Sequence, residues 1–200
     1  MAYSSFVQDG CLSDMAVASV VNAPEQVRLG LVTVFTGDGK GKTTAAIGTA
    51  VRAAGHGLKV CIIFFFKGEM YSQGEVNTLG SLSNIDIHCF GVTDWIKKEG
   101  DNSVAAKQAQ QALSTAGKMI ASGHYDLVIM DEVNNAVDFG LIDSQDVLDI
   151  LRTRPAKVDV LLTGRNADQR ITAVADVVTE MQCVKHAFER GIGARLGIDY

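Results

Sequence analysis

A short glycine-rich segment carries the clearest chemistry in this chain. Its residues are Thr36, Gly37, Asp38, Gly39, Lys40, Gly41, Lys42, Thr43 and Thr44. Glycines allow a sharp turn with inward-facing backbone N–H groups, and a helix start adds further N–H groups with partial positive charge. Lys42 would reach a phosphate as a point charge, and Thr43 would offer its hydroxyl to a magnesium ion. The pattern predicts a phosphate-binding loop (P-loop) for a nucleoside triphosphate, with ATP as the expected nucleotide.

The loop departs from the commonest P-loop pattern at its first position. That pattern begins with glycine five residues before Gly41, where this chain has Thr36. The alternative interpretation is a glycine-rich turn that binds no ligand. The alternating glycines, the Gly-Lys-Thr ending and the position between an apolar run and an alanine-rich run favour phosphate binding.

An acidic pair is the expected second element of such a site. The apolar run 127–130 leads directly into Asp131 and Glu132. In P-loop proteins an apolar strand that ends in a carboxylate lies on the metal side of the nucleotide, so either residue could hold magnesium directly or through water. The alternative is the acidic start of a helix, since carboxylates suit helix N-termini.

Apolar runs and helical patterns alternate along the rest of the chain. Short, continuous, β-branched runs predict strands that are buried on both faces. The expected strands are 31–35, 60–65, 85–90, 127–130, 158–162 and 177–179, and the expected helices are 42–54, 103–121 and 144–151. This alternation predicts an α/β fold of the P-loop NTPase-like class, a mostly parallel six-stranded sheet with helices on both faces. Ligands of such sheets bind at the carboxyl ends of the strands.

Length and composition indicate one globular domain. The chain has 200 residues, of which 47% are apolar and 20% are charged. Residues 1–29 show weak periodicity and are interpreted as an N-terminal arm, and residues 30–200 as the domain. The net charge of −5 argues against a nucleic-acid partner, because such binders usually carry a basic surplus.

Nothing in the sequence predicts a membrane or an oxidising environment. No apolar run approaches the roughly 20 residues that cross a bilayer, and no basic segment precedes an apolar block near the N-terminus. The four cysteines form no CxxC pair, which favours reduced, structural thiols over zinc or disulfides. The expected location is the cytoplasm.

Motifs beyond the phosphate loop extend over residues 30–200. They read Arg-Ala-Ala-Gly-His-Gly at 52–57, Phe-Phe-Lys-Gly at 65–68, Asp-Glu at 131–132, Leu-Thr-Gly-Arg at 162–165, Ala-Asp-Val-Val-Thr-Glu-Met at 175–181, Lys-His-Ala-Phe at 185–188 and Gly-Ile-Asp-Tyr at 197–200. With the phosphate loop and in this order, they make the sequence similar to the ATP:corrinoid adenosyltransferases of the CobA type.

This resemblance implies an enzyme with an unusual use of a P-loop. The family transfers the 5′-deoxyadenosyl group of ATP to Co(I) of a reduced corrinoid and releases triphosphate, in adenosylcobalamin biosynthesis or salvage. The implied ligands are ATP, Mg²⁺ or Mn²⁺, and cob(I)alamin or another corrinoid as substrate. The implied partners are an electron-donating reductase and a second copy of the chain in a homodimer. Co(I) carries no proton, so no general base is expected.

The resemblance also implies roles for particular residues at the triphosphate. Lys42, Thr43 and Glu132 are the expected catalytic residues, and Thr43 and Glu132 would hold the metal. Lys40 joins Lys42 in stabilising the departing triphosphate. The other loop residues would bind the nucleotide.

Four residues outside the loop are expected to contact a substrate. Arg52 and Arg165 are candidates for ribose or phosphate contacts, although Arg52 could equally be a solvated helix residue. Phe90 and Trp95 would exclude water and the lower axial ligand from the corrinoid site. The alternative for Phe90 is an ordinary core residue, since it ends an apolar strand.

Two other function classes share the phosphate loop. A P-loop ATPase or kinase would cleave at the γ-phosphate and yield ADP, and it would need a base or a water-positioning group there. A non-catalytic ATP-binding module would bind ATP but would not react with reduced cobalamin. A GTP-binding protein is disfavoured, because the sequence contains no Asn-Lys-x-Asp segment.

Overall fold

The computed structural model describes residues 28–68, 74–92 and 102–199. Trp95 and residues 1–27 of the arm therefore lie outside the described residues. The strands are β1 Val32–Thr36, β2 Val60–Phe64, β3 Ile85–Cys89, β4 Leu127–Asp131, β5 Asp159–Thr163 and β6 Val177–Glu180. Within the described residues they form one sheet in the order β3-β2-β4-β5-β1-β6, and every neighbouring pair is parallel.

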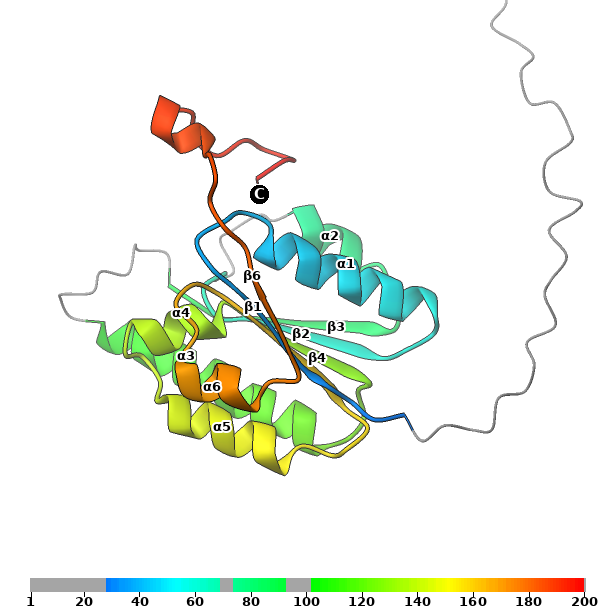
Figure 1. The fold of residues 1–200 in the computed structure, drawn as a ribbon. Coiled ribbons are helices and arrows are strands. Elements are labelled where there is room, and N and C mark those ends of the chain that lie inside the picture. Colours follow the sequence, from blue (N-terminus) through cyan, green and yellow to red (C-terminus); the bar gives the residue numbers. More distant parts are fainter. Residues whose placement is uncertain (1–27, 69–73, 93–101, 200) are drawn as a thin grey trace, which may run out of the picture.

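Helices cover both faces of this sheet (Figure 1). On one face lie α1, Lys42–Gly55, and α2, Gly74–Leu79. On the other lie α3 Ser103–Ala121, α4 Val133–Asp138, α5 Ser144–Thr153 and α6 Gln169–Val174. A short 3-10 helix, η1 Ala187–Arg190, follows β6 beyond the edge of the sheet.

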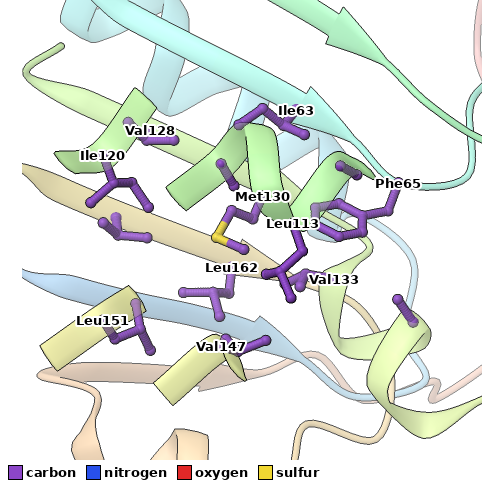
Figure 2. Close-up of a cluster of buried hydrophobic side chains, with 14 of the residues drawn as sticks. Ile63, Phe65, Leu113, Ile120, Val128, Met130, Val133, Val147, Leu151 and Leu162 are labelled. Carbon is purple, nitrogen blue, oxygen red and sulfur yellow. The ribbon is translucent and has the colours of Figure 1, made fainter. Parts of the chain in front are cut away.

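Two hydrophobic clusters fill the two interfaces between sheet and helices. Alternate residues of β2 belong to different clusters: Ile62 packs with Ala46 and Ala50 of α1, and Ile63 packs with residues of α3 and α5. Figure 2 shows the second cluster, where Leu113 and Val147 meet side chains of the central strands. Because β2 and β4 have helices on both faces, all five residues of each strand are buried.

The fold class predicted from the sequence is confirmed. The six expected strands and three expected helices are present, with ends that differ by at most two residues. The helices α2, α4, α6 and η1 were not predicted. Each has six residues or fewer, which is too short for a 3.6-residue period to stand out.

The strand order decides what meets at the carboxyl edge. Strand β5 lies between β1 and β4, so the loops that follow these three strands are neighbours. They contain the phosphate loop, the acidic pair and residues 164–168. None of the helices in the described ranges is long and apolar enough to cross a membrane.

Candidate nucleotide-binding site

The phosphate loop is held close to the segment that continues β6. Gly37 and Gly41 have φ values of 92° and 112°, where side chains are strained. A Cβ at Gly39 would lie 2.7 Å from the carbonyl oxygens of both Met181 and Gln182. Glycine at position 39 is thus required by close backbone approach, and glycine at positions 37 and 41 by conformation.

Backbone hydrogen bonds join this segment to the loop. The Met181 N–H donates to the Thr36 carbonyl at 2.8 Å, and the Gly39 N–H donates to the Met181 carbonyl at 2.6 Å. The Gly39 N–H is therefore bonded to the chain itself, although the glycine pattern predicts loop N–H groups that face a ligand.

Lys42 begins α1 and lies across the loop. Its ammonium group donates to the carbonyls of Gly37 and Gly39, both at 2.7 Å. Burial and the nearby positive charge of Arg165 lower the pKa of Lys42. An ammonium group held by neutral carbonyls can exchange them for anionic phosphate oxygens, which are stronger acceptors.

Asp131 ends β4 and has an exposed fraction of only 1%. Its Oδ1 accepts hydrogen bonds from the hydroxyls of Thr43 at 2.9 Å and Thr163 at 2.7 Å. Because the Thr43 proton is directed at Asp131, the lone pairs of the Thr43 oxygen remain for a cation. Asp131 thus orients the Thr43 hydroxyl by accepting its hydrogen bond.

Lys67 balances the buried charge of Asp131. Its ammonium nitrogen lies 3.4 Å from Asp131 Oδ2 and 3.0 Å from Glu75 Oε1, and 4.3 Å from the ring centroid of Phe64. Neither Lys67 nor Thr163 was predicted from the sequence as a site residue. The signal that could have found them is their place at or just after the carboxyl ends of β2 and β5, beside the acidic pair.

Replacing Lys67 with methionine is expected to lower the free energy of unfolding by about 2–4 kcal/mol, because Asp131 then keeps a buried charge without its cation. Urea denaturation measures the change, and Lys157→Met, at an exposed site before β5, is the matched control. A double variant with Asp131→Asn should recover part of the loss. Additive losses in the double variant would contradict this explanation.

Glu132 occupies a different environment from Asp131. Its φ of 65° is uncommon for a residue other than glycine, and its N–H donates to Thr163 Oγ1 at 2.8 Å. Its side chain lines the pocket above the loop. Burial, together with the negative charge of Asp131, raises the pKa of Glu132 to about 7.

The oxygens of Thr43 and Glu132 fit a hard divalent cation. Magnesium prefers hydroxyl, carboxylate, phosphate and water oxygens, and a protein often supplies only one or two of them. A cation beside Glu132 would also offset the charge that raises the pKa of this residue.

The pocket above the loop has a volume of about 660 Å³. It is bounded by residues 38–44 of the phosphate loop, by Glu132 and Asn135, by residues 163–165, and by residues 185–188, 192–195 and 199. Its walls carry five basic and three acidic side chains, so the surplus of positive charge favours binding of an anion. The basic residues are Lys40, Lys42, Arg165, Lys185 and Arg195, and the acidic residues are Asp38, Glu132 and Asp199.

Of the two arginines predicted to contact a substrate, Arg165 lines this pocket and Arg52 does not. Arg165 lines it, donates its N–H to Asn135 Oδ1 at 2.6 Å, and has Nε 3.9 Å from Asp38 Oδ1. Arg52 lies exposed in the last turn of α1, outside the set of described residues that line the pocket. Contact between Arg52 and a substrate stays a prediction.

Among the other predicted residues that the structure describes, some line the pocket and others contact the rest of the chain. Thr44 lines the pocket, whereas the Thr36 hydroxyl accepts a hydrogen bond from the Ala167 N–H at 3.2 Å. Phe90 is partly buried against the core cluster of α3 and α5, and its N–H donates to the Phe64 carbonyl at 2.9 Å. The corrinoid contacts expected for Phe90 and Trp95 stay predictions.

Comparisons with known proteins agree with this geometry. Residues 28–200 match the family model described as "ATP:corrinoid adenosyltransferase BtuR/CobO/CobP". The corrinoid adenosyltransferase of Escherichia coli (strain K12) is 38% identical over 89% of both chains, and that of Salmonella typhimurium (strain LT2) is 39% identical over 94% of both. The flagellar accessory protein FlaH from Methanocaldococcus jannaschii shares the fold, with a TM-score of 0.54 at 12% identity over 77% of this chain and 72% of that one.

Proposed function

This chain belongs to the ATP:corrinoid adenosyltransferase family, and on that premise we propose how its described residues carry out the reaction. It is an enzyme that transfers the adenosyl group of ATP to a corrinoid, in the synthesis of cobalamin. The proposal concerns the placement of the triphosphate, the metal ligands and the path of the electrons.

In the proposed reaction the triphosphate of ATP occupies the pocket above the phosphate loop. An electron pair of Co(I) forms the bond from cobalt to C5′ of the ribose, and the bond from C5′ to the triphosphate oxygen breaks. Cobalt is thereby oxidised from Co(I) to Co(III), and the electrons of the broken bond leave on the triphosphate. No proton is transferred, so the protein must bind, orient and stabilise charge.

Lys42 is the proposed stabiliser of the charge that develops on the leaving oxygen. Its ammonium group, held by Gly37 and Gly39 carbonyls in the nucleotide-free protein, would exchange them for phosphate oxygens. Lys40 and Arg165 line the same pocket and would add positive charge. Electrostatic groups placed in advance are often the largest contribution to such a reaction.

Thr43 and Glu132 are the proposed ligands of Mg²⁺ or Mn²⁺. When bound, this ion would supply positive charge at the phosphate oxygens and lower the barrier to triphosphate departure. The observation that carries the whole proposal is that the two acidic residues, Asp131 and Glu132, have different surroundings. Asp131 is buried and engaged by Thr43, Thr163 and Lys67, whereas Glu132 lines the pocket together with Lys42.

The corrinoid side of the site completes the proposal. Phe90 and Trp95 would exclude water and the lower axial ligand from cobalt. A separate reductase would supply the electrons that form Co(I), and the enzyme would act in the cytoplasm.

A homodimer is proposed as well. Strand β6 lies at the sheet edge, and its Val177 and Val178 have exposed fractions of 41% and 45%, which suits association. Light scattering during size-exclusion chromatography tests this, and a mass of one chain at all concentrations would contradict it.

Anaerobic incubation with ATP, magnesium and chemically reduced cobalamin tests the proposed reaction. The absorbance of Co(I) should disappear while adenosylcobalamin and tripolyphosphate form in equal amounts. ADP and phosphate as the nucleotide products would indicate an ATPase or kinase instead. ATP binding without any spectral change would indicate a non-catalytic module.

A further inference from the structure

We propose that Asp199 is an internal anion that occupies Lys40 and Arg195 in the nucleotide-free enzyme, and that the triphosphate displaces it and takes over both cations. This inference rests on the proposed function and deepens it, because it assigns Arg195 as a triphosphate ligand and Asp199 as its competitor.

The geometry places one carboxylate between two cations of the pocket. Oδ1 of Asp199 forms an ion pair with the ammonium group of Lys40, at the tip of the phosphate loop. Oδ2 accepts hydrogen bonds from the Arg195 N–H at 2.9 Å and from Arg195 Nε at 3.0 Å. All three residues line the pocket. A carboxylate that bridges two cations beside a phosphate loop takes the place that a phosphate oxygen would take.

The burial of the three side chains favours an exchange. The side chain of Asp199 is 16% exposed, whereas those of Lys40 and Arg195 are 51% and 59% exposed. The side chains of Lys40 and Arg195 can therefore move toward a ligand, whereas the Asp199 carboxylate is more shielded from solvent. Lys40 and Arg195 also hold the pKa of Asp199 well below its usual range, which keeps the carboxylate charged at neutral pH.

Local backbone structure holds this carboxylate in place independently of its charge. The Asp199 N–H donates to the Arg195 carbonyl at 2.8 Å, which turns the chain back onto Arg195. The preceding part of the segment is fixed to the loop through Met181. Asparagine at position 199 can still accept from the Arg195 N–H, so Asp199→Asn removes the charge with little change of shape.

The two possible roles of Asp199 predict effects of opposite sign. If Asp199 competes with the ligand, Asp199→Asn frees two cations and triphosphate binds more tightly. If it only fastens the C-terminal segment over the pocket, the same change loosens the wall and triphosphate binds more weakly. The sign of the change therefore decides between them.

Isothermal titration of the full chain with inorganic tripolyphosphate measures this sign. Asp199→Asn should tighten binding by about 3- to 10-fold, and Arg195→Gln should weaken it by a similar factor, as expected for charge pairs at a partly exposed site. The matched control is Asp149→Asn, which removes the carboxylate partner of Arg152 on α5 and should change affinity less than twofold. In turnover assays, added tripolyphosphate should inhibit Asp199→Asn at a correspondingly lower concentration.

Unchanged or weaker binding by Asp199→Asn would overturn the inference, as would an Arg195→Gln variant that binds like the wild type. Failure of the proposed triphosphate site, on which this inference rests, has a different signature. In that case the wild type would bind neither ATP nor tripolyphosphate, and Lys42→Ala would change nothing.

Discussion

Lys42→Ala is expected to lower kcat/KM by about 10²- to 10³-fold or more, because it removes a cation placed in advance for the departing triphosphate. The loss should fall mainly on kcat, since charge on the leaving oxygen is greatest in the transition state. Anaerobic assays that follow Co(I) absorbance and tripolyphosphate formation measure both constants.

The fold should tolerate this change. Among the described residues, the Lys42 ammonium group donates only to the carbonyls of Gly37 and Gly39, which can bind water instead in a pocket that opens to solvent. Thermal unfolding of Lys42→Ala should therefore resemble that of the wild type. Lys157→Ala, at the amino edge of the sheet, is the control for loss of a lysine. A fully active Lys42→Ala enzyme would refute the phosphate-loop assignment.

Glu132→Gln is expected to make the nucleotide-free protein more stable and the enzyme nearly inactive. Burial and the charge of Asp131 raise the pKa of Glu132 to about 7 in the folded chain, above its value in the unfolded chain. Between these two pKa values the folded state binds more protons, so the stability of the wild type falls as pH rises and the penalty is complete above about pH 7. Glutamine carries no such penalty.

The variant should therefore unfold at a temperature higher by a few degrees at pH 8, which corresponds to about 1 kcal/mol, and by much less at pH 5. Its metal-dependent activity should drop by about 10²-fold or more, since an amide is a weak magnesium ligand. In the wild type, kcat/KM at subsaturating magnesium should rise with pH through about 7, as Glu132 of the metal-free enzyme loses its proton.

Asp146→Asn, an exposed carboxylate on α5, is the matched control for the loss of an acidic residue. Paired scans at pH 5 and pH 8 with and without magnesium and ATP separate the two effects. If Glu132→Gln lowers the unfolding temperature at pH 8, the Glu132 carboxylate carries no buried-charge penalty. If the variant keeps metal-dependent turnover, Glu132 is not the metal ligand.

Nearby residues acquire different roles through small differences in placement. Asp131 and Glu132 are adjacent, yet one is buried at the end of β4 and the other turns into the pocket through a positive φ. Thr163 joins them, because its hydroxyl donates to Asp131 and accepts from the Glu132 N–H. The unusual backbone at Glu132 is thus supported by a neighbouring strand, which is how strained conformations persist at functional sites.

The sequence by itself determined the six strands, the three longer helices and the residue types of the phosphate loop. Continuous apolar runs at β2 and β4 and the alanine-rich pattern of α3 are local signals, since they depend only on residue type and period. The phosphate loop is equally local, because its glycines, Lys42 and Thr43 lie within a few residues of one another. The family motifs added the activity, which no period or spacing could supply.

Only the tertiary structure decided which distant residues meet above the loop. Lys40 and Asp199 are 159 positions apart, and their contact depends on β6 pairing with β1 and on the path of residues 181–199. Likewise, Lys67 reaches Asp131 because β2 pairs with β4. The physical reason is that charge pairing acts through space and carries no sequence period, so it becomes visible only when strand order brings the partners together.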